Sequence, residues 1–143
     1  MTHQRTKIRD GLYRVLTQHL DVKVSKDATE ETMPKAGGKA VVLILPISDE
    51  PSEDEPIGST QSIDATISIA VYGRGENVWD VVDDACADIE QAILNNPSLH
   101  GTVTSMSYAG FDPGDLNVEG SAGGLYLGTL SYTGQYTRRN DNA

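Results

Sequence analysis

Residues 63–94 contain a strand pattern followed by a helix pattern, and this pair constrains the fold more than any other feature. From Ile63 to Tyr72, apolar residues alternate with small or polar ones, which predicts a strand that is buried on one face. From Val78 to Leu94, apolar residues recur at helical spacing, which predicts an amphipathic helix. Its opposite face is acidic and carries Asp80, Asp83, Asp84, Asp88 and Glu90.

The rest of the chain supplies the other elements of one predicted domain, residues 1–143. A helix is expected at 6–20 and strands at 21–26, 40–47, 102–111 and 125–137. Loops are expected at 27–39, 48–60 and 112–124, with a flexible C-terminal tail at 138–143. The order α-β-β-β-α-β-β predicts an α+β fold in which a mainly antiparallel sheet packs with two helices on one face.

Charge is distributed unevenly along the chain. Residues 1–39 hold eight Lys and Arg against five Asp and Glu, whereas residues 40–137 hold only Arg74 against fifteen acids. Such an acidic body argues against tight binding of DNA or RNA, because affinity for phosphates needs clustered cations. Five acids crowd the predicted loop 48–60, which we expect to be mobile. They are Asp49, Glu50, Glu53, Asp54 and Glu55.

No motif in the sequence predicts a cofactor or a metal. The turn Gly73-Arg74-Gly75 lies where a dinucleotide fingerprint would lie, but Val78 replaces the third glycine and Glu76 would repel a pyrophosphate. The acidic loop and the pair Asp112 and Asp115 lack the calcium-loop pattern. The three histidines are far apart in the sequence, without metal-type spacing.

Catalytic residues are not predicted either. Cys86 is the only cysteine and falls on the apolar helix face, which predicts a buried thiol, excludes an internal disulfide and fits a reducing cytoplasm. Nothing singles out two of the many acids as an acid–base pair. The tyrosines of the last strand are expected in the core or at an interface. Arg138 and Arg139 either pair with an acidic neighbouring subunit or form a solvated tail.

Neither membrane insertion nor secretion is expected. No apolar run approaches the roughly 20 residues of a membrane span. The N-terminus is not followed by the apolar core of a signal peptide.

The order of elements, together with four sequence patterns, resembles the tail terminator proteins of long-tailed bacteriophages, the group similar to minor tail protein U. The resemblance covers roughly residues 3–138. The patterns are the strand end Val71-Tyr72-Gly73, the helix V-x-x-V-V-D-D-A-x-x-x-I-x-x-A-I from Val78 to Ile93, the link Asn-Pro-x-Leu-x-Gly from Asn96 to Gly101, and the strand L-x-Y-x-x-x-Y from Leu130 to Tyr136.

The resemblance implies a structural function without catalysis. Members of this family form a hexameric ring that caps the tail tube, stops its polymerisation and offers a surface to the filled head. The implied partners are the tail tube protein and a head-completion or neck protein, and the implied location is the head-proximal end of the virion tail after assembly in the host cytoplasm. The acidic loop 48–60 would project from the ring. Genomic DNA would pass an anionic bore without tight binding.

A ring needs two different complementary patches on each subunit. The sequence suggests that Arg5, Arg9 and Arg14 of the first helix meet Asp80, Asp84 and Asp88 of a neighbouring copy. Two alternatives remain open. One is another head–tail joining or tail completion protein, and the other is a small cytoplasmic ligand-binding domain or enzyme.

Overall fold

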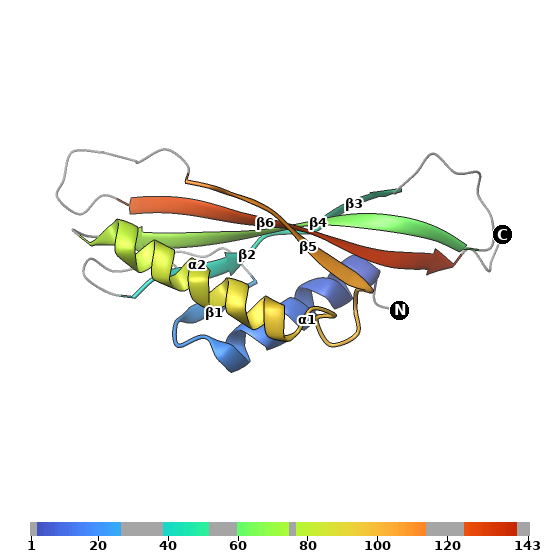
Figure 1. Cartoon of the computed structure of the whole chain (residues 1–143), viewed down its shortest axis with the longest axis horizontal. Helices are drawn as coiled ribbons and strands as arrows, with labels where there is room; N and C mark the ends of the chain where they lie inside the picture. The colour runs from blue at the N-terminus through green and yellow to red at the C-terminus, as the bar shows by residue number, and fades with distance from the viewer. Residues whose placement is uncertain (1–2, 27–38, 52–59, 75–76, 114–124, 140–143) are drawn as a thin grey trace.

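The structure, a computed structural model, describes residues 3–26, 39–51, 60–74, 77–113 and 125–139 (Figure 1). Its elements in chain order are α1 (Gln4–His19), β1 (Lys23–Ser25), β2 (Val41–Ile44), β3 (Ser48–Pro51), β4 (Thr60–Arg74), α2 (Val78–Asn95), β5 (Ser105–Asp112) and β6 (Leu125–Arg139). The predicted α+β class and the predicted order are confirmed, and a short strand, β3, is added between β2 and β4.

The sheet is built on one long antiparallel ladder. β4 and β6 pair over fifteen residues, from Thr60 opposite Arg139 to Arg74 opposite Leu125. The sheet order is β1-β2-β4-β6-β5, and β3 pairs with β4 beyond the end of β2. Only β1 and β2 run parallel. Figure 1 shows the ladder as a twisted ribbon that extends past the helices at one end, as the right-handed twist of strands dictates for so long a pair.

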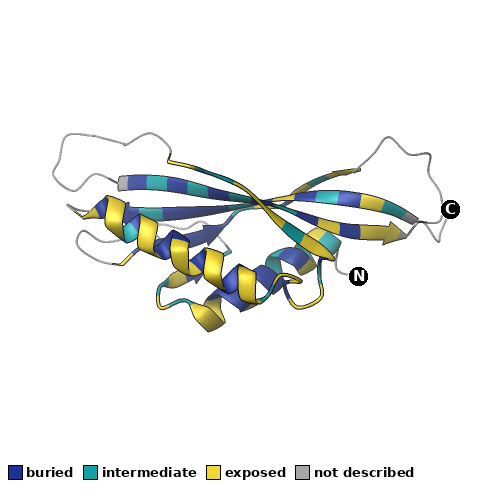
Figure 2. Ribbon diagram, in the orientation of Figure 1, coloured by how far each residue is buried: buried dark blue, intermediate teal, exposed yellow. Residues whose placement is uncertain are grey.

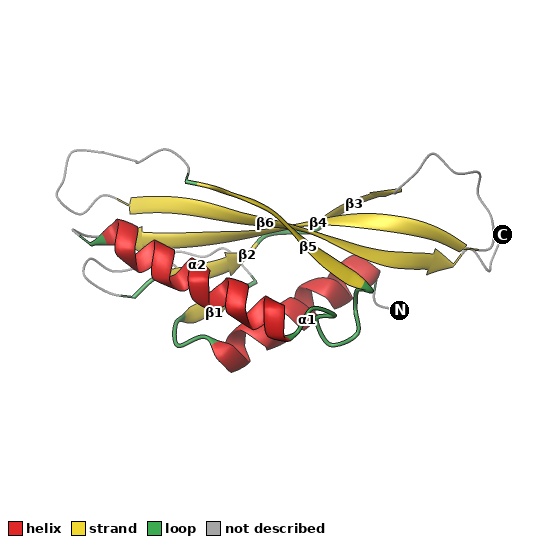
Figure 3. Cartoon of the chain, in the orientation of Figure 1, coloured by secondary structure: helices red, strands yellow, loops and turns green. Residues whose placement is uncertain are grey.

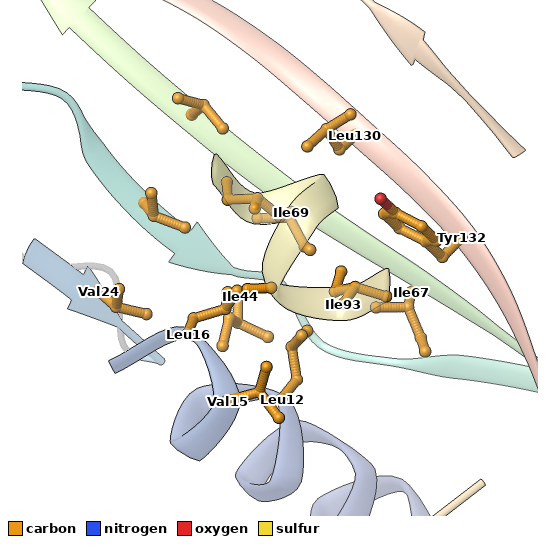
Figure 4. Packing of buried hydrophobic residues seen from close by; sticks show 14 of the residues in the cluster. Leu12, Val15, Leu16, Val24, Ile44, Ile67, Ile69, Ile93, Leu130 and Tyr132 are labelled. Atoms are coloured by element: carbon orange, nitrogen blue, oxygen red, sulfur yellow. The ribbon is translucent and has the colours of Figure 1, made fainter. Parts of the chain in front are cut away.

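Both helices cover the same face of the sheet (Figure 3). α2 packs on β4 and β6, while α1 packs on β1 and β2 and against α2. The alternation along β4 explains this, because Ile67, Ile69 and Val71 point into the core while Thr66 and Ser68 point to the opposite face. Figure 4 shows Leu12 and Leu16 of α1, Ile93 of α2 and Tyr132 of β6 among the side chains that fill the core between sheet and helices.

The tight link between α2 and β5, residues 96–104, packs against α1 and so connects the two helices in space. Leu99 is fully buried and has a φ of 49°, and His100 and Gly101 also have positive φ. α1 can approach this link because it carries Gly11, whose missing Cβ would stand 2.4 Å from the Leu99 carbonyl oxygen. The glycine that weakens α1 by propensity is therefore required by packing.

The prediction of a loop over residues 48–60 is partly wrong, because residues 48–51 form β3. Ser48 pairs with Thr66 and Pro51 pairs with Ile63. β4 is much longer than β2, so its backbone beyond Ile44 needs further partners, and β3 supplies them. Thr60 belongs to β4 rather than to the loop. Residues 52–59, and with them Glu53, Asp54 and Glu55, lie outside the described residues.

Other boundaries also differ from the predictions, by one to three residues at α1, β1 and β2 and more instructively at β5 and β6. The strand predicted from Thr102 begins at Ser105, because the backbone N–H groups of Thr102 and Val103 donate to the Ser98 carbonyl and close a turn. The predicted tail 138–143 begins too early, since Arg138 and Arg139 belong to β6 opposite Gln61 and Thr60. Residues 27–38, 114–124 and 140–143 of the predicted loops and tail lie outside the described part of the chain.

Candidate assembly surfaces

α2 presents an acidic surface whose charges are not neutralised within the described chain. Figure 2 shows buried and exposed bands alternating along this helix. Asp80, Asp84 and Asp88 are exposed at a spacing of four residues, and Asp83 and Glu90 flank them. None of these five carboxylates forms a salt bridge with another described residue. Like charges four residues apart repel by a few tenths of a kcal/mol per pair, so this surface costs the isolated chain some stability.

The three arginines of α1 do not form one surface. The Arg5 guanidinium lies 3.3 Å from the Asp49 carboxylate of β3 in the same chain. Arg9 is half-buried beside Pro46 and Ile47, and its Nε has no hydrogen-bond partner among the described atoms. Only Arg14 of the three is exposed without an ion pair in the described chain. Lys7, which the sequence pattern did not single out, is exposed seven residues before it.

A polar pocket of about 410 Å³ lies between the start of α1 and the end of the β4–β6 ribbon. At its wall the Asp49 carboxylate accepts a hydrogen bond of 2.6 Å from the Tyr136 hydroxyl and forms an ion pair with Arg5. Burial, the hydrogen bond to Asp49 and its negative charge raise the pKa of Tyr136 to about 12. The structure thus brings together Arg5 and Asp49, which the sequence placed in two separate surfaces, and the pair ties β3 to α1.

Arg138 lines the same pocket, together with Glu50. It is exposed on β6, so the arginine predicted to lie in a tail instead has a fixed backbone position in the sheet. Arg139 takes the last position of β6.

An apolar groove of about 450 Å³ runs between α2 and the edge strand β5. Its walls include Leu94 from the helix and Met106 and Tyr108 from the strand, and Tyr132 forms part of its floor. Leu94 and Tyr108 are 73% and 54% exposed. The sequence pattern did not predict this groove. Leu94 fits the spacing of the apolar stripe, which predicts a buried side chain, whereas the structure leaves Leu94 exposed beside β5.

Cys86 and the predicted turn at Gly73 both have packing positions in the described chain. Cys86 lies on the buried face of α2. Burial, reinforced by the negative charges of Glu90 and Asp83, raises the pKa of its thiol to about 12, so the thiol stays protonated near neutral pH. Within the described ranges no three His, Cys, Asp or Glu side chains converge as metal ligands. Gly73 makes room for Val78 and Val82 of α2, a packing role. No helix in the described part of the chain is both long and apolar enough to cross a membrane.

Comparison of the sequence with profiles of known protein families finds no match, and a search of curated proteins finds none either.

Proposed function

We propose that this chain is a structural virion protein, the tail terminator of a long-tailed bacteriophage. It forms a hexameric ring that caps the tail tube, stops its polymerisation and provides the surface to which the head attaches. Its partners are further copies of itself, the tail tube protein and a head-completion or neck protein. It acts at the head-proximal end of the tail, after assembly in the host cytoplasm, and it performs no reaction and needs no cofactor.

The observation that carries the proposal is the pair of oppositely charged helix surfaces on one subunit. Asp80 and Asp88 lie about 12 Å apart along α2, and Lys7 and Arg14 lie about 10.5 Å apart along α1, at 1.5 Å per residue. Neither pair is neutralised within the described chain. Two surfaces of opposite sign and similar span support a head-to-tail contact between copies, which closes into a ring when the rotation allows it.

The order of elements supports the same assignment. An amphipathic helix, paired strands, a long strand followed by an acidic helix, and two closing strands occur in the sequence in which the family resemblance requires them. The acids of α2 that do not meet a neighbour would contribute to an anionic bore, through which DNA passes by like-charge repulsion.

Charge reversal tests the ring. The double variant Asp84→Lys/Asp88→Lys should lose hexamer by light scattering coupled to size exclusion, while its circular dichroism and thermal midpoint stay close to the parent protein. The matched variant Lys7→Glu/Arg14→Glu should lose hexamer in the same way. Combining all four substitutions restores opposite charges and should restore the ring. An unchanged hexamer population in both double variants would contradict the proposed contact.

Particle morphology tests the function itself. Phage particles that lack this protein should carry overlong tail tubes in electron micrographs, because nothing stops polymerisation. Tails of normal length without heads would instead identify a head–tail joining protein. A strictly monomeric protein that binds a metabolite tightly would support the small ligand-binding domain or enzyme.

A further inference from the structure

The groove between α2 and β5 is an apolar surface that the described chain leaves open. Of the three large apolar side chains that are exposed in the described residues, two, Leu94 and Tyr108, border it. The third, Trp79, lies near the start of α2 and packs its ring 4.3 Å from that of Tyr126. An exposed apolar groove of this kind is typical of a protein–protein contact.

The strand at this groove favours side-chain insertion over the addition of a strand. β5 is an edge strand whose only sheet neighbour among the described strands is β6. Its pairing is interrupted by an irregularity between Tyr108 and Gly110, and Gly110 has a φ of 140°. A bulge at an edge twists the strand and interrupts the hydrogen-bond ladder that an incoming strand would extend. The occupant therefore inserts side chains between α2 and β5.

Charge decides between the possible occupants. Glu90 lines the groove, and Asp84 and Asp88 lie on the exposed side of the same helix. Among the described residues that line the groove there is no cation. Two copies joined groove to groove would bring their acidic helices together, which like-charge repulsion opposes. The occupant must bring apolar side chains that are flanked by cations.

Such a surface exists at the opposite edge of the same subunit. The end of α1 and the start of β1 carry Tyr13, Leu20 and Val22, which are half-buried, together with the exposed cations Arg14 and Lys23. The one exposed acid between them, Asp21, forms an ion pair of 2.7 Å with Lys39, so the edge remains positive. β1 and β5 are the two opposite ends of the sheet path. One copy therefore presents both surfaces on different sides and can join two neighbours at once, which is the requirement for a closed ring.

We propose that the groove between α2 and β5 receives the α1–β1 edge of a second copy of this chain, with the solvent-exposed parts of Leu20 and Val22 packing between Leu94 and Tyr108 and with Arg14 facing Glu90. The choice of a second copy as occupant rests on the proposed ring. The contact itself is new, because the charges of the two helices do not by themselves place the α1–β1 edge in the groove.

Cross-linking between differently substituted copies tests this contact. In a Cys86→Ala background, Leu94→Cys and Val22→Cys are prepared as separate proteins, mixed at the highest attainable concentration and treated with a short bis-maleimide. A mixed dimer linking position 94 to position 22 is expected, and little product from either protein alone. A dimer of Leu94→Cys alone would show groove-to-groove pairing, and the absence of any mixed product would show that another surface is used. Either result overturns the proposal.

Polar substitution in the groove gives a second readout. Leu94→Ser and Tyr108→Ser should each weaken self-association by on the order of tenfold to a hundredfold, as expected for the loss of a large buried apolar side chain. Trp79→Ser removes an exposed aromatic side chain outside the groove and should leave self-association unchanged, which makes it the matched control. Sedimentation velocity over a concentration series measures all three. Equal effects at all three positions would contradict the proposal.

The outcomes separate this inference from the proposed function. If overlong tails appear without the protein but the mixed cross-link does not, the terminator assignment stands and the groove contact is wrong. If the cross-link forms but tails keep their length, the contact stands and the function is wrong.

Discussion

α1 and α2 both pack an apolar stripe on the same face of the sheet, but within the described chain only α1 adds ion pairs to this packing. α1 is tied to the chain by polar contacts: Arg5 pairs with Asp49, Asp10 with Lys26, and the Gln4 amide donates to the Thr102 carbonyl oxygen at 2.7 Å. α2 has no salt bridge in the described chain and is held by its apolar stripe. Charge on α1 is thus partly used in folding, whereas charge on α2 remains available for a partner.

The largest effect is expected where α2 depends on burial. Ile89 is fully buried on its inner face, so Ile89→Ala should lower the free energy of unfolding by about 2–5 kcal/mol. Leu94→Ala on the outer face of the same helix is the control and, at concentrations at which both proteins are monomeric, should stay within about 0.5 kcal/mol of the parent. Urea unfolding measures both. Similar losses at the two positions would show that α2 is not held by its inner stripe alone.

On α1, packing against the Leu99 link should outweigh helix propensity. Gly11→Ala gains up to about 1 kcal/mol by propensity, but its methyl group collides with the Leu99 carbonyl. Net destabilisation of about 1–3 kcal/mol is expected, as for other overpacked sites. Gln18→Ala, at an exposed position of the same helix, should be neutral or slightly stabilising. Stabilisation by Gly11→Ala in urea unfolding would mean that the link moves away without cost.

The polar attachment of α1 predicts a smaller effect that depends on pH. Tyr136→Phe removes the hydrogen bond to Asp49 and should cost about 1 kcal/mol at neutral pH. Because folding raises the pKa of Tyr136 from 10 to about 12, its proton stabilises the native state below pH 10, and this contribution is lost as pH rises toward 12.

Stability of the parent protein should therefore fall over that alkaline range, and that of Tyr136→Phe should fall less steeply. Thr137→Ala, which removes no titratable group from the neighbouring position, should keep the parent slope. Urea unfolding between pH 8 and 11 measures the slope of stability against pH for all three proteins. Equal slopes would show that Tyr136 does not cause the alkaline loss of stability.

The smallest effects should differ in sign between the helices. Asp84→Asn relieves repulsion from Asp80 and Asp88 and should stabilise the monomer by a few tenths of a kcal/mol. Asp10→Asn removes a 2.9 Å ion pair with Lys26 and should destabilise it by a similar amount. Both effects should shrink in high salt, which thermal unfolding at two salt concentrations would test. The same sign for both variants would contradict the contrast between the helices.

The sequence predicted most of the fold, because period and composition are local properties. The alternation from Ile63 to Tyr72 and the helical stripe from Val78 onward identified β4 and α2, and the tyrosine face of the last strand identified buried positions. Predicted boundaries were wrong where pairing partners decide them. Residues 48–51 look like loop because they are polar and contain proline, and they form β3 only because β4 extends beside them.

The candidate surfaces divide in the same way. The acidic face of α2 follows from the spacing of Asp80, Asp84 and Asp88, which a helix of any fold would place on one side. The role of Arg5, the apolar groove at Leu94 and Tyr108, and the opposite position of β1 and β5 depend on contacts between distant segments. Only tertiary structure brings such segments together, because burial and pairing are settled by the whole sheet rather than by neighbours in the chain.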